Sequence, residues 1–198
     1  MPIKIFSVDE NAFKLLFQIK IMSLYENFPY NIRKKIKERD ELEFIIKDLR
    51  TQNPEIKIVT TNGAFDLLHP GHIRSLADAS SYGDKLIVGI NSDSSVKQYK
   101  TDLRPILSQE YRSIMLASIS FVDYVTIFYE KKSLKFLESI RPDFHIKSKE
   151  GYDGSDGTMV EKYGGKIILV DDLEGISTSL IIESIIEKYS KTPPLKIF

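Results

Sequence analysis

Two of the chain's three histidines stand three residues apart, in the stretch TNGAFDLLHPGHIRSLADAS that covers residues 61–80. Pro70 suits the first position of a helix, which places His69 at the helix cap and His72 in the first turn. The N–H groups and the dipole at a helix N-terminus favour an anion. Gly71 keeps the surface low enough for a close approach. The stretch therefore predicts a phosphate site with two imidazole hydrogen-bond donors.

A cluster of cations follows in NSDSSVKQYKTDLRPILSQEYR, residues 91–112. Asn91 and Asp93 close a strand-like run, at the edge where a parallel sheet binds ligands. The cations are Lys97, Lys100, Arg104 and Arg112. Their types and spacing alone leave two interpretations open, a solvated charged face and a set of phosphate ligands.

Three hydroxyl side chains begin the last helical pattern, in EGISTSLII at residues 174–182. A hydroxyl at a helix N-terminus caps the backbone or binds phosphate. Capping needs one hydroxyl, so Ser177, Thr178 and Ser179 leave room for a ligand.

The elements that would position these groups are short apolar runs alternating with helical patterns. We expect strands at 56–61, 85–91, 123–128, 143–147 and 166–170, and helices at about 71–81, 108–119, 132–140, 157–163 and 178–190. Strands with apolar centres separated by helices indicate a parallel sheet covered on both faces. The predicted fold is α/β, a doubly wound, Rossmann-like, five-stranded parallel sheet that binds ligands beyond the carboxyl ends of its strands.

The residues before the first expected strand are rich in charge and show a helical pattern. Pro29 breaks this pattern, and Asn53-Pro54 ends it. We therefore divide the chain into a helical N-terminal extension (1–53), a domain that carries the chemistry (54–190) and a tail (191–198). The apolar stripes of the extension need a partner, either the domain itself or a second subunit.

Composition excludes several classes of function. The 198 residues carry 28 basic and 28 acidic side chains, so no global basic field indicates binding to nucleic acid or to a membrane surface. Cysteine is absent, which rules out disulfides, thiolate metal sites and cysteine nucleophiles. No signal peptide is apparent, and no run approaches the roughly 20 apolar residues of a membrane helix. We expect a cytoplasmic protein.

HPGH, residues 69–72, matches the HxGH motif of the nucleotidyltransferase superfamily. Residues 41–188 resemble the cytidylyltransferase-like family, and within it the bacterial adenylyltransferases that act on D-glycero-β-D-manno-heptose 1-phosphate. TNGAFDLLHPGH, GDKLIVGINSDSSVKQYK, RPI and EGISTSLII occur in the family's order and spacing.

The resemblance implies roles for individual residues. The implied catalytic residues are His69, His72, Lys97 and Arg112. The implied nucleotide-binding residues are Thr61, Asn62, Gly63, Ala64, Phe65, Asp66, His69, Gly71, His72, Asn91, Asp93, Lys97, Arg104, Arg112, Lys147, Gly175, Ile176, Ser177, Thr178 and Ser179. For the acceptor we expect Asp66, Lys149 and Tyr152. No protein metal ligand is expected, and Mg²⁺ arrives with the nucleotide. The implied partners are ATP or CTP, a small phosphorylated acceptor and a second copy in a homodimer.

One loop departs from the heptose enzymes. Lys147 is followed by Ser148, Lys149 and Glu150, where those enzymes usually continue with a Lys-Gly-Gly-Asp-like run. This departure bears on the acceptor, because the loop follows the fourth predicted strand. His145, just before it, is expected to be a residue of the sheet.

The chemistry implied by the resemblance needs no general base. A sugar 1-phosphate is largely a dianion near pH 7, since the second pKa of a phosphomonoester is about 6. Its oxygen can attack the α-phosphorus of ATP directly, so catalysis consists of positioning and charge stabilisation.

Two alternatives stay open. The first is a cytidylyltransferase for glycerol 3-phosphate or a similar alcohol phosphate. Such relatives usually carry an arginine where this chain has Asp171-Asp172-Leu173, which favours adenylyl transfer. The second is a nucleotide-binding regulator without catalysis, although both histidines and the hydroxyl cluster are intact.

Overall fold

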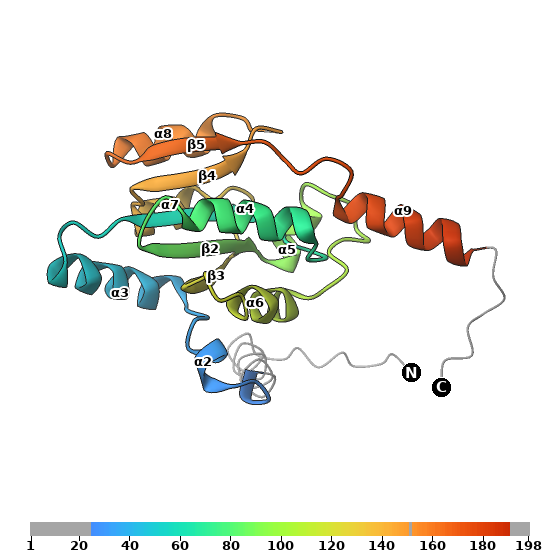
Figure 1. Cartoon of the computed structure of the whole chain (residues 1–198), viewed down its shortest axis with the longest axis horizontal. Helices are drawn as coiled ribbons and strands as arrows, with labels where there is room; N and C mark the ends of the chain where they lie inside the picture. The colour runs from blue at the N-terminus through green and yellow to red at the C-terminus, as the bar shows by residue number, and fades with distance from the viewer. Residues whose placement is uncertain (1–24, 151, 191–198) are drawn as a thin grey trace, which may run out of the picture.

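The computed structural model describes residues 25–150 and 152–190. Its centre is a five-stranded parallel sheet with the order β3-β2-β1-β4-β5 (Figure 1). The strands are β1 (Ile58–Gly63), β2 (Lys85–Asn91), β3 (Tyr124–Phe128), β4 (Phe144–Ser148) and β5 (Lys166–Val170). The prediction of a five-stranded parallel doubly wound sheet is confirmed.

The strand order reverses at β1. The chain moves outward from β1 through β2 to β3, and then returns to place β4 on the other side of β1. Thr60 of β1 pairs in register with His145 of β4, and Thr61 with Ile146. The crevice for ligands in such a sheet lies at this reversal, beyond the carboxyl ends of the strands.

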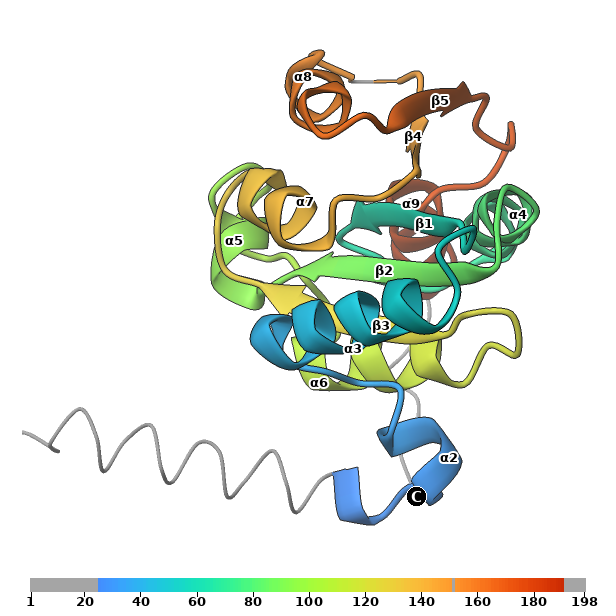
Figure 2. The ribbon, with the colours of Figure 1, turned by 90° about the vertical axis from the view of Figure 1, so that its left-hand side faces the viewer.

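Helices cover both faces of the sheet (Figures 1 and 2). On one face α4 (Pro70–Ser80) and α6 (Gln109–Ala117) bury Leu76 and Leu116 against strand residues such as Val88. On the other face lie α3 (Arg39–Gln52), α7 (Leu134–Ile140) and α8 (Ser155–Lys162). Because side chains alternate along a strand, β1 sends Val59 to the first core and Ile58 to the second.

The remaining helices lie around these layers. They are α2 (Tyr30–Arg33), α5 (Asp93–Lys97) and α9 (Thr178–Tyr189). The five-residue helix α5 was not predicted, because one turn is too short to show a helical period. Helix α9 extends away from the sheet (Figure 1). None of the helices in the described part of the chain is long and apolar enough to cross a membrane.

Helix α3 packs on the sheet layer. Leu42 and Ile46 are almost fully buried in the same cluster as Phe136 of α7. The predicted extension, residues 1–53, thus supplies part of the packing of the domain within its described residues. Its first 24 residues and the tail 191–198 lie outside the described residues, and the domain boundary at residue 53 stays a prediction.

Candidate active site

A cavity of about 970 Å³ opens at the carboxyl edge of the sheet. It is bordered by the ends of β1, β2 and β4 and by the N-terminal ends of α4, α8 and α9. Many of the residues predicted from the sequence line it, namely Thr61, Asn62, Gly63, Ala64, Phe65, Asp66, His69, Gly71, His72, Asn91, Arg104, Lys147, Tyr152, Gly175, Ile176, Ser177, Thr178 and Ser179.

The histidine pair sits at the start of α4. His69 occupies the N-cap in an extended conformation, Pro70 is the first helical residue, and His72 lies in the first turn. The two imidazoles stack, with centroids 3.7 Å apart and planes inclined by 24°. A Cβ on Gly71 would come within 3.0 Å of the His69 ring. The absence of a side chain at position 71 therefore makes room for the His69 ring.

Both imidazoles are neutral at neutral pH. Burial lowers the pKa of His69, and it lowers the pKa of His72 to about 4, with His69 as the second cause. The Nδ1 atom of each ring is buried and has no hydrogen-bond partner among the described residues. Two stacked rings cannot both carry a positive charge without strong repulsion, and an anion bound beside them would offset that repulsion.

The hydroxyls of α9 face the same cavity. Ser177 is the N-cap and its Oγ accepts a hydrogen bond from the backbone N–H of Leu180 at 3.2 Å. Thr178 and Ser179 also line the cavity, and their hydroxyls make no hydrogen bond within residues 25–150 and 152–190. Capping thus consumes one hydroxyl of the cluster, and the other two remain available to a ligand.

Asp66 accepts three protein donors. Its Oδ1 accepts the backbone N–H groups of Ile106 and Leu107 at 2.7 and 3.1 Å, and its Oδ2 accepts Arg104 Nε at 2.5 Å. Asp66 therefore fastens the loop after α5 to the end of β1, and Arg104 lines the cavity as half of a nearly buried ion pair.

Arg112 connects two strand ends through buried hydrogen bonds. It is fully buried on α6 and donates to the backbone oxygens of Ala64, Asn91 and Leu107, as well as to Asp93 Oδ1 at 2.7 Å. These bonds tie together the ends of β1 and β2. The structure does not bring Arg112 or Asp93 to the cavity lining, and the hydrogen bonds of Arg112 hold the ends of the two strands that border it.

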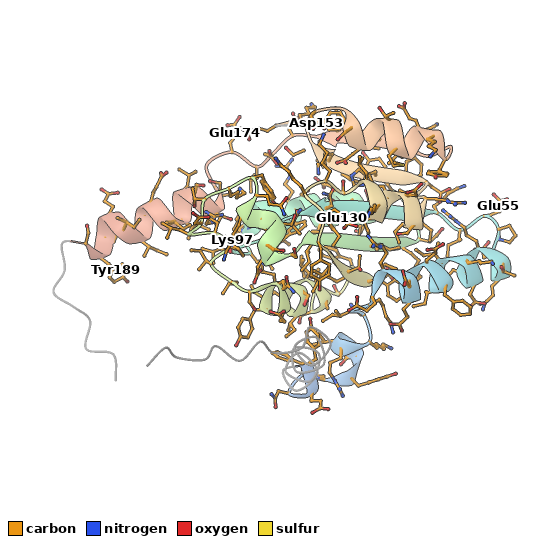
Figure 3. All side chains as sticks on the ribbon, turned by 180° about the vertical axis from the view of Figure 1, so that it is seen from behind. Glu55, Lys97, Glu130, Asp153, Glu174 and Tyr189 are labelled. Atoms are coloured by element: carbon orange, nitrogen blue, oxygen red, sulfur yellow. The ribbon has the colours of Figure 1, made fainter. Side chains whose placement is uncertain are left out.

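The lysines near the cavity also differ from expectation. Lys97 is exposed at the end of α5, outside the cavity lining, whereas Lys100 lines the cavity (Figure 3 labels Lys97). Lys131 and Lys132, after β3, line it as well. The side chains of Lys100 and Lys131 make no ion pair or hydrogen bond among the described residues. Lys149 is exposed, pairs with Asp171 and does not line the cavity.

A polar chain runs along the other flank of the cavity. Lys147 Nζ donates to Asn62 Oδ1 at 2.8 Å and lies 3.2 Å from Asp156 Oδ2. Below them, His145 Nδ1 shares a hydrogen bond of 2.8 Å with Thr60 Oγ1. His145 is fully buried in β4, which confirms the expectation that it is a residue of the sheet.

Sequence reasoning missed several lining residues, among them Tyr99, Lys131, Ser133 and Asp156. Lys131 and Ser133 follow the end of β3, and Asp156 lies in the first turn of α8. A usable signal was their position, since residues directly after a parallel strand meet at one edge. No group of three or more His, Asp or Glu side chains in the described part of the chain could hold a metal ion.

Comparison of the sequence with known protein families agrees with the site described above. A family model described as cytidylyltransferase-like matches residues 60–184, more than half of the chain. The chain belongs to the cytidylyltransferase-like family. The predicted resemblance is thereby confirmed, and with it the prediction of a nucleotidyltransferase at the level of the family.

Relatives in this family are proteins named bifunctional protein HldE. The chain is 41% identical to that of Pelobacter propionicus over 160 residues, which cover 79% of this chain and 32% of the relative. It is 45% identical to that of Campylobacter jejuni subsp. jejuni serotype O:6 over 159 residues, 80% of this chain and 33% of the relative. The chain thus spans about a third of the length of these relatives.

A solved structure shares the fold. The crystal structure of the lipopolysaccharide core biosynthesis protein from Thermoplasma volcanium GSS1 is similar with a TM-score of 0.53 and 25% sequence identity. The match covers 60% of this chain and 99% of that protein.

Proposed function

We propose that the chain transfers AMP from ATP to a sugar phosphate, with heptose 1-phosphate as the acceptor, and releases pyrophosphate. The observation that carries this proposal is the placement of the stacked His69–His72 pair and the α9 hydroxyls in one cavity. The resemblance to heptose adenylyltransferases and the similarity to HldE proteins support it.

The reaction would be a single displacement. An oxygen of the acceptor phosphate forms a bond to the α-phosphorus of ATP, and the bond from that phosphorus to the oxygen bridging to the β-phosphorus breaks. Neutral His69 and His72 would donate hydrogen bonds to the α- and β-phosphates, where negative charge builds in the transition state. Thr178 and Ser179 would hold the outer phosphates at the N-terminus of α9.

Lysines would balance the charge of the two phosphate groups. The ammonium groups of Lys100 and Lys131 have no partner among the described residues, so they can neutralise an anion in the cavity without first breaking an ion pair. Lys100 thereby takes the role expected of Lys97. Arg112 would act as a positioning residue that holds the ends of β1 and β2.

Magnesium would enter with the nucleotide, bound mainly by phosphates and water, and would neutralise charge on the triphosphate. The described carboxylates do not form a protein cage for the ion, because Asp66 already accepts three protein donors and Asp156 pairs with Lys147. We further expect a cytoplasmic homodimer. The exposure of Ile185 and Ile186 on α9 supports a second subunit.

Cytidylyl transfer is the second candidate, since the family itself is described as cytidylyltransferase-like. Asp172 and Leu173 line the cavity at the place where cytidylyltransferases usually carry an arginine. This favours ATP as the nucleotide.

A matrix of substrates tests the proposal. ATP and CTP are each combined with heptose 1-phosphate, mannose 1-phosphate and glycerol 3-phosphate, and pyrophosphate release is followed. We expect release with ATP and a sugar 1-phosphate. A preference for CTP with glycerol 3-phosphate would favour the second candidate, and no release with any pair would indicate a binding protein without catalysis.

A further inference from the structure

A second polar site lies in the cavity, on the flank away from the histidines. Asp156 in the first turn of α8 is 6% exposed, and Ser133 at the start of α7 is 3% exposed. Ser133 Oγ donates to Asp156 Oδ1 at 2.5 Å, and Lys147 Nζ lies 3.2 Å from Oδ2. Both Asp156 and Ser133 line the cavity.

The surroundings of Asp156 keep its carboxyl group charged. Burial opposes ionisation, but contacts with His145, Lys147 and Ser133 hold the pKa of this carboxyl well below its usual range. A buried ion pair rarely stabilises a fold more than apolar packing would. A carboxylate that stays charged on the wall of a cavity can accept hydrogen bonds from a ligand.

Asp156 also has unused acceptor capacity. A carboxylate accepts about four hydrogen bonds, and the described residues supply one hydrogen bond from Ser133 and the ion pair with Lys147. His145 Nε2 lies 3.8 Å from Oδ2, beyond hydrogen-bond distance, and is itself buried without a partner. A polar ligand group could reach Asp156 without displacing a protein donor.

The other carboxylates of the cavity differ from Asp156. Asp66 is buried but accepts three protein donors. Asp153, Glu150, Asp172 and Glu174 are exposed at the rim (Figure 3 labels Asp153 and Glu174). Among the described residues, Asp156 thus combines burial, charge and free acceptor sites.

The chemistry of the ligand follows from this charge. A carboxylate repels phosphate, so Asp156 is unsuited to the nucleotide's phosphates, but it accepts hydrogen bonds from hydroxyl groups. Lys147 and Asn62 place this site beside the ends of β4 and β1, next to the centre of the cavity.

We propose that Asp156, held by Ser133 and Lys147, determines acceptor specificity by accepting hydrogen bonds from hydroxyls of the sugar ring. This inference rests on the proposed function, and it names the part of the cavity that distinguishes a polyhydroxylated acceptor from a plain phosphate ester.

Calorimetry with two acceptor probes tests the site. Heptose 1-phosphate or mannose 1-phosphate carries ring hydroxyls, whereas cyclohexyl phosphate has a six-membered ring and a phosphate without them. Both are titrated into the full chain with α,β-methylene ATP, which cannot release pyrophosphate. We expect the unaltered chain to prefer a sugar phosphate by about tenfold or more, the scale of hydrogen bonds to a charged group.

Asp156→Asn keeps the shape of the side chain but removes its charge. We expect this variant to bind the sugar phosphate about tenfold more weakly and cyclohexyl phosphate equally well or more tightly. A general loss of structure would weaken both probes. Asp171→Asn is the matched control, because Asp171 is exposed and does not line the cavity, and we expect its affinities to equal those of the unaltered chain.

Two results would overturn the proposal. One is an Asp156→Asn variant that keeps the preference for the sugar phosphate. The other is equal binding of cyclohexyl phosphate and both sugar phosphates by the unaltered chain. This second result needs no variant, so it can be obtained even if Asp156→Asn fails to fold. Pyrophosphate release in the same preparation, with ATP, tests the proposed function separately, because sugar recognition and catalysis are then measured by different signals.

Discussion

The imidazole rings of His69 and His72 lie face to face, with their centroids 3.7 Å apart, at the N-terminal end of α4. Burial opposes protonation of both rings, and His69 adds to the effect at His72, so both pKa values are lowered. In the proposed function, a phosphate bound beside them would accept hydrogen bonds from these neutral rings.

The first prediction concerns stability against pH. His72 has an ordinary pKa of 6.5 that burial lowers to about 4, so between these values the unfolded chain binds more protons than the folded chain. Stability should therefore fall as the pH drops from about 6.5 to about 4. His72→Gln should flatten this fall, measured by urea unfolding at several pH values. An unchanged pH profile in the variant would contradict the assigned burial of His72.

The second prediction concerns two lysines that stand three residues apart and differ in their position relative to the cavity. Lys100 lines the cavity and Lys97 does not. Lys100→Ala should raise KM for a phosphate-bearing substrate about tenfold, since a charge-assisted contact is lost. Lys97→Ala is the matched control and should leave both KM values nearly constant. Steady-state kinetics with each substrate varied in turn decides, and a larger effect from Lys97→Ala would refute this placement.

The third prediction concerns the loop after β4. Tyr152 lines the cavity, and its hydroxyl accepts the N–H of Gly157 at 3.1 Å, which fixes it over the start of α8 beside Asp156. Tyr152→Ala should raise KM for the acceptor and leave KM for the nucleotide unchanged. Lys149→Ala should change neither, because Lys149 lies outside the cavity lining. If only the nucleotide's KM moves, the loop does not serve the acceptor.

The fourth prediction tests whether α3 folds with the sheet. Leu42 is fully buried against α7 and β-strand residues, so Leu42→Ala should reduce the free energy of unfolding by about 2–5 kcal/mol. Phe44 on the same helix is 73% exposed, and Phe44→Ala should change stability by less than about 0.5 kcal/mol. Denaturant unfolding should show one transition. A separate early transition for α3 would mark an independent extension.

The sheet could be predicted because its signal is local. Runs such as KLIVGIN are apolar in every central position, as a strand buried on both faces requires, and the observed β2 has the predicted bounds 85–91. The role of α3 could not be predicted in the same way. Its helical period was visible, but periodicity does not say which surface an apolar face contacts.

The residues of the candidate site also differ in how well the sequence predicted their positions. The order of strand, glycine turn and helix placed His69 and His72 correctly at the start of α4. Lys97 and Lys100 stand three residues apart, and the sequence alone did not show which one faces the cavity. Arg112 was expected at phosphate because of the family resemblance, whereas the fold buries it among carbonyl oxygens. These assignments depend on tertiary packing, which local pattern does not contain.

The most direct test of the account is turnover of ATP with heptose 1-phosphate by the unaltered chain, His69→Ala and His72→Ala, with pyrophosphate and the ADP-sugar both quantified. We predict equal amounts of the two products from the unaltered chain. Each variant should lose about 10²-fold or more in kcat, the scale of losing one transition-state donor, with unfolding little changed. Near-normal turnover in both variants would contradict the account.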